Sequence, residues 1–302
     1  MDRRILDQAA RHCRVVPGRP LDLRRHPPNW LPVEPRSTLH RATLKDRAEE
    51  LLEDSRKRLA DQQEVLWASN GYALLIVLQG LDAAGKDGIV KHVLGSVNPM
   101  GCTVHSFRAP NAEELEHDFL WRAARRLPER GQIGVFNRSY YEEVVVVRVH
   151  PEFLAAQRLP GITAGPLWQS RYRSIREFER HLSVNGTIVR KFFLHLSKEE
   201  QTKQLCERID DPTKFWKFNQ RDVEERAHWN DFHRFYQEAL AATSTREAPW
   251  YVIPADRRWF ARALVAHILV RTIESLKLSL PQPTPKDRRA MAVAKRALAA
   301  DG

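Results

Sequence analysis

The chain alternates short apolar runs with longer segments in which apolar residues recur every three or four positions. The short runs are typical of buried strands, and the periodic segments predict helices with one buried face. Strands are predicted at about 72–79, 102–107, 132–136, 187–196 and 250–253. Helices are predicted at about 39–70, from the loop after the first strand to 97, at 111–127, at 168–182, from 197 onward and at 257–276. Strands that alternate with helices predict an α/β fold, with a central parallel sheet covered on both faces.

The same pattern divides the chain into parts. Six prolines between positions 17 and 35 disfavour long helices, so residues 1–38 are predicted to form an extended arm. Residues 39–280 are predicted to form one domain, and residues 281–302 a polar, basic tail. Within the domain, 208–240 mixes aromatic and charged residues on predicted helices and is interpreted as a helical lid. Residues 144–149 fit either a strand or a helix, because β-branched residues favour a strand but the position in the chain favours a helix.

The first predicted strand runs into a glycine-rich loop, GLDAAGKDG, which begins at Gly80. Gly80 and Gly85 permit turns that point backbone N–H groups at phosphate oxygens, and Lys86 adds a positive charge. The spacing matches the Walker A pattern except at its last position, where Asp87 replaces the Ser or Thr that normally holds Mg²⁺. Asp82 would repel a phosphate unless a metal ion lay between them, so the loop predicts a phosphate chain bound through a metal.

The third predicted strand ends at a second polar motif, NRSYYE, which begins at Asn137. Ligands bind at the carboxyl ends of strands in open α/β sheets, so Arg138 is placed to reach a phosphoryl group during transfer. A surface salt bridge is the alternative role for Arg138. Neither motif contains an obvious general base, and the twelve histidines show no spacing such as HExxH. A phosphate acceptor is already anionic at neutral pH and needs no base, so this composition fits transfer onto a phosphate.

The predicted lid presents several cations, among them Arg208, Lys214, Lys217 and Arg226. Closing such a cover would exclude water and bring these cations onto the transferring phosphate. From Lys203 to Arg226, however, six Lys and Arg are offset by six Asp and Glu, so the segment is not net basic. A plain pair of exposed helices is therefore the alternative interpretation.

Composition limits the class of protein. The 302 residues are 42% apolar, which is enough for a sizeable core, and no apolar run approaches the roughly 20 residues of a membrane helix. No secretory signal is evident at the N-terminus, and Cys13, Cys102 and Cys206 are scattered, as is typical of thiols in a reducing compartment. We therefore expect a cytoplasmic protein without a membrane partner.

The formal net charge of +11 indicates an anionic partner or simply favours solubility. A basic, nucleotide-dependent nucleic-acid binder is one alternative from a different class. The sequence contains no helix-turn-helix signature, zinc-ligand spacing or RNA-recognition aromatics that we can identify. No nucleic-acid partner is therefore expected.

Three separated motifs resemble the second family of polyphosphate kinases: GLDAAGKDG from Gly80, NRSYYE from Asn137 and DPTKFWK from Asp211. The resemblance covers nearly all of 39–280 and implies a three-layer α/β/α P-loop kinase core similar to thymidylate kinase, with a helical lid. It implies phosphoryl transfer between inorganic polyphosphate and a nucleotide, with Mg²⁺ or Mn²⁺ as cofactor. By motif position, the resemblance implies four catalytic residues: Asp82, Lys86, Arg138 and Arg208. The residues implied in phosphate or nucleotide binding are Gly80, Ala83, Ala84, Gly85, Asp87, Gly88, Asn137, Tyr141, Glu142, Lys214, Lys217 and Arg226. The implied metal ligands are Asp82 and Glu142. A homo-oligomer is also expected.

The second motif departs from the family pattern of members that phosphorylate nucleoside diphosphates. Those members typically read DRSWYN, whereas this chain has Asn137 for the Asp and Glu142 for the Asn. The motif looks more like the branch that accepts monophosphates, or both mono- and diphosphates, so we expect reversible conversion of AMP to ADP, with ADP to ATP as a further activity. A neutral amide at Asn137 binds Mg²⁺ more weakly than a carboxylate, and Glu142 is the candidate replacement. An ATP-dependent nucleoside monophosphate kinase is the alternative enzyme, which the choice of donor distinguishes.

Overall fold

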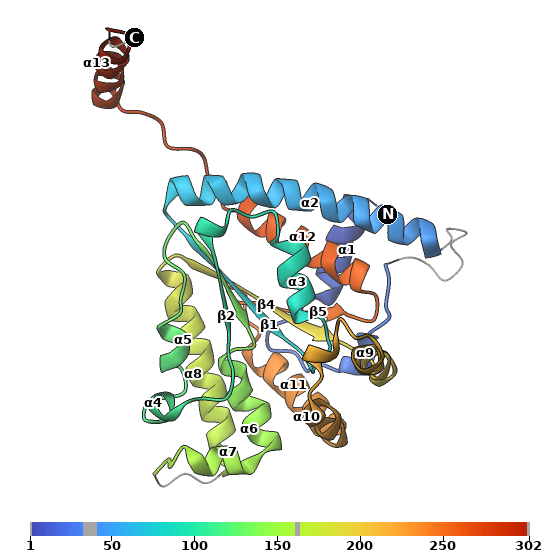
Figure 1. The fold of residues 1–302 in the computed structure, drawn as a ribbon. Coiled ribbons are helices and arrows are strands. Elements are labelled where there is room, and N and C mark those ends of the chain that lie inside the picture. The colour runs from blue at the N-terminus through green and yellow to red at the C-terminus, as the bar shows by residue number, and fades with distance from the viewer. Residues whose placement is uncertain (1, 33–40, 161–163, 301–302) are drawn as a thin grey trace.

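The computed structural model describes residues 2–32, 41–160 and 164–300, and its centre is a parallel sheet of five strands (Figure 1). The strands are β1 (Ala73–Gln79), β2 (Cys102–Ser106), β3 (Ile133–Asn137), β4 (Thr187–His195) and β5 (Trp250–Pro254). Their order in the sheet is β2-β3-β1-β4-β5, and every neighbouring pair is parallel. The predicted α/β fold with a parallel sheet is confirmed, since all five predicted strands are present.

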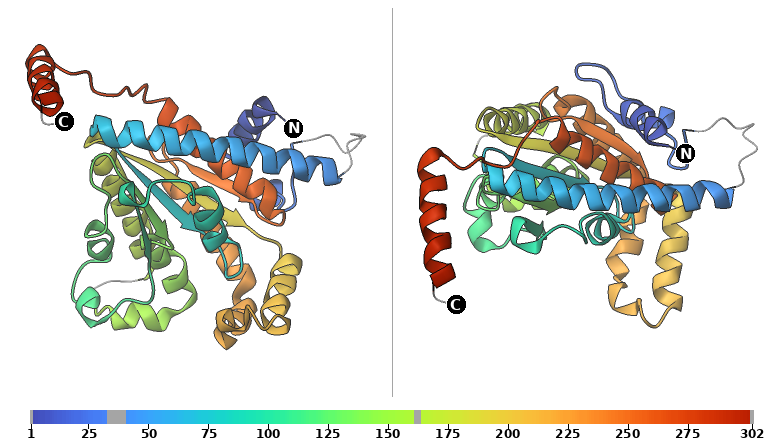
Figure 2. Two further views of the ribbon diagram at one scale, coloured as in Figure 1. Left: turned by 45° about the horizontal axis from the view of Figure 1, so that its top comes forward. Right: turned by 90° about the horizontal axis from the view of Figure 1, so that it is seen from above.

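Helices cover both faces of this sheet. One face carries α1 (Arg3–Cys13), α2 (Arg41–Ser69), α3 (Lys86–Val93) and α12 (Arg258–Glu274), and the other carries α8 (Ala164–Val184) and α11 (Trp229–Thr243). Shorter elements connect them: η1 (Leu23–Arg25), η2 (Pro99–Gly101), α4 (Ala112–Leu115), α5 (Trp121–Ala124), η3 (Tyr140–Val144), α6 (Val146–Val149), α7 (Pro151–Ala156), α9 (Lys198–Asp210), η4 (Phe215–Lys217), α10 (Gln220–Glu224) and η5 (Glu225–His228). The last helix, α13 (Pro285–Ala300), stands apart from the body (Figure 2).

Two apolar cores lie on the two faces of the sheet. Along β1, Leu74, Ile76 and Leu78 pack in the core under α2 and α12, whereas Leu75 and Val77 pack in the core under α8 and α11. Successive side chains of a strand point to opposite faces, so a strand buried on both sides reads as a continuous apolar run. Among the described residues, no helix combines the length and apolar character needed to cross a membrane.

The N-terminal part of the chain is not the extended arm that its prolines predict. Residues 3–13 form α1, whose Leu6, Ala9 and Cys13 are buried in the core, and the backbone N–H of Val15 donates to the carbonyl of Trp250 in β5. The prediction was wrong for α1 because every proline of the segment lies beyond it. The predicted boundary at residue 38 lies outside the described residues.

Two further predictions need correction, and the structure adds detail to two others. The helix predicted over 111–127 is interrupted between α4 and α5, and the ambiguous segment 144–149 is helical. The predicted lid extends too far: in α11, residues from Phe232 to Leu240 include five buried side chains that belong to the core, so the exposed cover spans residues 208–228, hereafter the lid. The basic tail contains the helix α13, none of whose residues is buried.

The strand register places the two polar motifs side by side. Leu78 of β1 pairs with Asn137 of β3, so the chain leaves both strands at the same edge of the sheet. The backbone N–H of Arg138 donates to the carbonyl of Leu78 at 3.0 Å, which ties the second motif to the base of the glycine-rich loop.

Candidate active site

The glycine-rich loop wraps the N-terminus of α3. Gly85, at φ 98°, is the N-cap of α3 and supplies no side chain to cap it, so the first N–H groups of the helix face the loop. Gly80, at φ 150°, follows β1 and lies so close to β4 that a Cβ there would be 2.9 Å from the carbonyl oxygen of Leu194. Free N–H groups together with the positive end of the helix dipole make this loop an anion site.

Lys86 closes the loop from inside. Its Nζ donates to the carbonyls of Gly80 at 2.7 Å and Leu81 at 3.1 Å, and only 8% of the residue is exposed. Burial, reinforced by the positive charge of Arg138, lowers the pKa of Lys86 to about 8. An ammonium group with so little access to water is strongly stabilised by a phosphate oxygen, because the anion supplies the hydrogen-bond partner that solvent does not provide.

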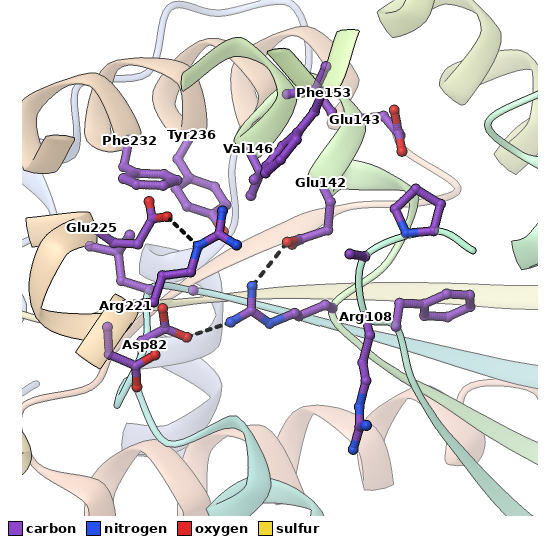
Figure 3. A pocket seen from close by; sticks show the side chains of 18 of the residues that line it. Asp82, Arg108, Glu142, Glu143, Val146, Phe153, Arg221, Glu225, Phe232 and Tyr236 are labelled. Carbon is purple, nitrogen blue, oxygen red and sulfur yellow. Dashed lines mark hydrogen bonds and ion pairs between the residues drawn. The ribbon is translucent and has the colours of Figure 1, made fainter. Parts of the chain in front are cut away.

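Arg138 joins the two motifs. Its Nη2 lies 2.5 Å from Asp82 Oδ1 in the glycine-rich loop, and its Nη1 lies 3.1 Å from Glu142 Oε2, four residues on in its own motif. Figure 3 shows Asp82 and Glu142 approaching this one guanidinium from different elements. The charge of Glu142, and then that of Asp82, raises the pKa of Arg138 above its ordinary value. The residue is held with φ at 61°, a left-handed conformation that is uncommon for a side chain with a Cβ.

Two cavities of similar size meet at this arginine. The first, of about 550 Å³, is lined by Lys86, Lys91, Arg208, Lys214, Lys217, Arg258 and Arg262, and is called the basic cavity. The second, of about 560 Å³, is lined by Phe107, Val146, Val147, Phe153, Trp229 and Phe232 among other residues, and is called the apolar cavity. Asp82, Phe107, Arg108 and Arg138 line both cavities, so these four residues form their junction.

The structure brings together all but one of the residues named from the sequence. Ala83, Ala84, Gly85, Lys86, Asp87, Gly88, Asn137, Arg208, Lys214 and Lys217 line the basic cavity, Gly80, Glu142 and Arg226 line the apolar cavity, and Asp82 and Arg138 line both. The exception is Tyr141, which is fully buried, lines neither cavity and donates its hydroxyl to Glu179 inside the core. The prediction of Tyr141 as a binding residue is wrong, because η3 turns this side chain away from the strand end and into the sheet's second core.

The cations of the lid already have partners. Arg208 Nη1 lies 2.8 Å from Asp222 Oδ2, and Lys214 Nζ lies 2.9 Å from Asp211 Oδ2. Arg226 donates to the side chains of Gln201 and Thr202 in α9. The pairs with Asp222 and Asp211 explain part of the balance between acidic and basic residues in this segment. The three cations lie along the walls of the cavities, Arg208 and Lys214 in the basic cavity and Arg226 in the apolar cavity.

Sequence reasoning missed several residues of the site. Arg258 and Arg262 reach the basic cavity from the first turns of α12, and Phe153 reaches the apolar cavity from α7. The two arginines are four positions apart at the start of a helix that follows the last strand, which is a signal that the sequence did contain. A helix that begins at the carboxyl edge of a parallel sheet places its first turns beside the ligand site.

Comparison with known proteins agrees with this geometry. The family model described as Polyphosphate kinase 2 (PPK2) matches residues 42–281. An ADP-polyphosphate phosphotransferase of Rhodopseudomonas palustris is 53% identical over 81% of this chain and 86% of its own length, and an AMP/ADP-polyphosphate phosphotransferase of Meiothermus ruber is 46% identical over 79% and 86%. The crystal structure of polyphosphate kinase 2 from Arthrobacter aurescens superposes with a TM-score of 0.80 at 38% identity, covering 96% of this chain and 95% of that one. The chain therefore belongs to the polyphosphate kinase 2 family.

Proposed function

We propose that the basic cavity binds inorganic polyphosphate, that the apolar cavity binds a nucleotide, and that the chain transfers a phosphoryl group between them. The observation that carries this proposal is the junction: Asp82 and Arg138 line both cavities, so one group can be in contact with a substrate on each side. Phosphoryl transfer needs the donor and acceptor in line with positive charge on the moving group, and a shared arginine meets that need.

The linings of the two cavities differ as the two substrates do. Nine Lys and Arg side chains line the basic cavity, two of them at the junction, which suits a polymer with a negative charge at every repeat. The apolar cavity presents aromatic side chains such as Phe153 and Phe232, together with Arg221 and Arg226. Aromatic faces stack on nucleobases, and the arginines supply partners for the phosphates of the nucleotide.

The residues of the chain divide the work of the transfer. The N–H groups of the glycine-rich loop and Lys86 hold the phosphate chain, and Arg138 stabilises the charge that develops on the phosphoryl group as it moves. The acceptor is itself a phosphate and is anionic at neutral pH, so no side chain has to remove a proton from it. The lid, whose Arg208 and Arg226 line one cavity each, covers the junction and excludes water.

A divalent cation, Mg²⁺ or Mn²⁺, fits the oxygen donors at the junction. Asp82 presents a carboxylate at the junction, and Glu142 presents one beside it in the apolar cavity. Within 2–32, 41–160 and 164–300, no cluster of three or more Asp, Glu, His or Cys is arranged to hold a metal alone. Magnesium is commonly bound by one or two carboxylates together with substrate phosphates, which is the donor set that Asp82 and Glu142 would complete. When bound, the cation neutralises the negative charge of the phosphate oxygens.

We propose AMP and ADP as acceptors, with the reaction reversible. The support is the acceptors in the names of the relatives from Rhodopseudomonas palustris and Meiothermus ruber, and the Asn137 and Glu142 of the second motif. In the structure Asn137 Nδ2 donates to Asp87 Oδ1 at 2.8 Å in the basic cavity, whereas Glu142 faces the apolar cavity. Of Asn137 and Glu142, Glu142 is therefore the one that lines the cavity proposed for the acceptor.

A matrix of donors and acceptors tests the proposal. Purified protein is incubated with Mg²⁺, with polyphosphate or ATP as donor, and with AMP or ADP as acceptor, and the nucleotide products are separated by chromatography. We expect ADP from polyphosphate and AMP, and ATP from polyphosphate and ADP. Product from ATP and AMP without any from polyphosphate would instead show an ATP-dependent nucleoside monophosphate kinase, and no product with polyphosphate would refute the proposal.

A further inference from the structure

An ion pair lies in the core behind the active site. Glu179 of α8 and Lys191 of β4 are 1% and 0% exposed, and Lys191 Nζ lies 2.5 Å from Glu179 Oε2. Lys191 also donates to the hydroxyl of Tyr141 at 2.9 Å and to the carbonyl of Thr243 at 2.8 Å. The second oxygen of Glu179 accepts from the hydroxyls of Tyr140 at 2.9 Å and Tyr141 at 2.8 Å. Two consecutive tyrosines therefore share a single carboxylate oxygen.

Stability alone does not account for this pair. Removing two charges from water costs several kcal/mol per ion, and well-packed apolar residues often serve a core equally well or better. Burial accordingly lowers the pKa of Lys191, although the charge of Glu179 opposes that shift. Neither Glu179 nor Lys191 lines the basic or the apolar cavity, so substrate contact does not explain the pair either. What the pair does is to fix the two tyrosine hydroxyls.

These tyrosines belong to the turn that carries the active-site side chains. Tyr140 and Tyr141 lie in η3 between Arg138 and Glu142, the two residues that form the ion pair at the junction. The near end of this turn is held from β1, because the side chain of Ser139 accepts from the amide of Gln79 at 3.1 Å and from the N–H of Tyr141. Its far side is held in the core by the hydroxyls of Tyr140 and Tyr141, which donate to Glu179, and by Arg171, which donates to the backbone carbonyl and the carboxylate of Glu143.

The backbone at Arg138 needs such support. A left-handed φ is unfavourable for a residue with a Cβ, so this conformation persists only where the surroundings hold it. A relaxed turn would move the guanidinium away from Asp82 and the carboxylate of Glu142 away from the acceptor. Misplacement of a reacting or stabilising group by about 1 Å is enough to lower a rate by as much as about 100-fold.

We propose that Glu179, backed by Lys191, is a positioning residue for phosphoryl transfer: it holds Tyr140 and Tyr141, and through them the turn that aims Arg138 and Glu142 at the junction of the two cavities. This inference rests on the proposed function. It assigns a part in catalysis to four residues that contact no substrate, and it gives Tyr141 a role in place of the binding role that its sequence position suggested.

The test removes one hydroxyl rather than the ion pair. Replacing Glu179 would leave Lys191 charged and unpaired in the core, which is strongly destabilising and threatens folding. Tyr141→Phe keeps the ring, the ion pair and the bond from Tyr140 to Glu179, and removes the hydroxyl that contacts Glu179, Lys191 and Thr243. The double variant Tyr140→Phe/Tyr141→Phe removes both hydroxyls.

Tyr172→Phe is the matched control. Tyr172 is also a buried tyrosine, 1% exposed, whose hydroxyl accepts from Arg148 at 2.8 Å, and it lies in α8 without contact to η3 through that hydroxyl. Each single variant therefore loses one buried hydroxyl and its hydrogen bonds. We measure kcat, the KM for polyphosphate, the KM for the nucleotide and the melting temperature of all three variants.

We expect Tyr141→Phe to lower kcat about tenfold and the double variant to lower it further, with both KM values within about twofold of wild type. Tyr172→Phe is expected to lower the melting temperature, by no more than Tyr141→Phe does, and to keep kcat within about twofold of wild type. An unchanged kcat in the double variant, or an equal loss in Tyr172→Phe, would overturn the inference while leaving the proposed function in place. Absence of transfer by the wild-type protein would refute the proposed function itself.

Discussion

Arg138 Nη2 lies 2.5 Å from Asp82 Oδ1, and this contact joins two segments that are 56 positions apart in the chain. Asp82 belongs to the loop after β1 and Arg138 follows β3, the neighbouring strand in the sheet. Both residues line both cavities. Under the proposed assignment of the cavities, a phosphoryl group would pass from one cavity to the other at this ion pair, and each of its members has a charge that the reaction can use.

Replacing Asp82 with Asn keeps the size of the side chain but removes its charge. We expect Asp82→Asn to lower kcat by about 100-fold or more, because the group loses both its ion pair with Arg138 and its capacity to hold a divalent cation beside the phosphates. Steady-state assays with polyphosphate and AMP measure the effect. Asp87→Asn is the control, since Asp87 lines only the basic cavity, and we expect a loss below about tenfold. Equal losses in the two variants would contradict a special role for the junction.

Separate substitutions in the two cavities should affect different substrates. We expect Phe153→Ala to raise the KM for the nucleotide about tenfold, since stacking on an aromatic ring is worth about 1–3 kcal/mol per base, and to leave the KM for polyphosphate within about twofold. Arg262→Ala should do the reverse, because it removes a cation from the basic cavity alone. Initial rates measured with each substrate varied in turn give both constants. If both variants raised the same KM, the assignment of the cavities would be wrong.

The sequence was sufficient to predict the sheet and the residues nearest the junction. β1 is buried on both faces and so appears as an uninterrupted apolar run, and the glycine spacing that follows it admits few other structures. Arg138 could be placed because it follows a strand that the pattern identifies. The direction of Tyr141 could not, since a tyrosine after a strand is equally compatible with a cleft and with a core until the turn η3 is known.

Tertiary contacts also determine where the lid ends and how the predicted N-terminal arm folds. Phe232, Phe235 and Tyr236 read as part of a polar, aromatic cover, yet they pack on the sheet because α11 continues from the lid onto the second core. Leu6 lies in a short segment rich in arginine, and its burial depends on α12, which is more than 250 positions away. Periodicity reports which side of a helix is apolar but not which partner covers it.

The packing of α1 predicts that the N-terminal segment contributes to stability. Leu6 is fully buried in the first core, so Leu6→Ala is expected to lower the free energy of unfolding by about 2–5 kcal/mol, through lost apolar contacts and the cavity that remains. Unfolding in urea, followed by circular dichroism, measures the change. Val16→Ala is the control because Val16 is 52% exposed, and we expect a change below about 0.5 kcal/mol. Similar values for the two variants would show that α1 does not contribute to the core in solution.

The lowered pKa of Lys86 predicts a limit to activity at alkaline pH. With the pKa at about 8, the free protein loses the ammonium charge above this pH, so kcat/KM for polyphosphate is expected to fall about tenfold per pH unit between 8.5 and 9.5. In Lys86→Arg the charge persists throughout this range, and we expect a lower but flat profile. The same fall in both proteins would mean that another group titrates.

The same shift has an opposite consequence for the stability of the free protein. Between pH 8 and the ordinary lysine pKa of 10.5, the unfolded chain binds more protons at Lys86 than the folded chain does. The contribution of Lys86 to the free energy of unfolding therefore rises with pH across this window. The activity and the stability that depend on this residue should thus change in opposite directions as the solution is made alkaline.

His195 predicts sensitivity to acid. It is 5% exposed, its Nδ1 lies 2.8 Å from the carbonyl oxygen of His26, and burial lowers its pKa to about 4 from the ordinary 6.5. Between pH 4 and 6.5 the unfolded chain binds a proton at His195 that the folded chain does not bind. The free energy of unfolding therefore decreases as the pH is lowered, by about 2 kcal/mol from pH 7 to pH 5. In His195→Asn, whose amide can still donate to His26, urea unfolding should show a weaker dependence over this range, whereas the exposed His181→Asn should follow wild type. Parallel curves for all three proteins would show that His195 does not carry this effect.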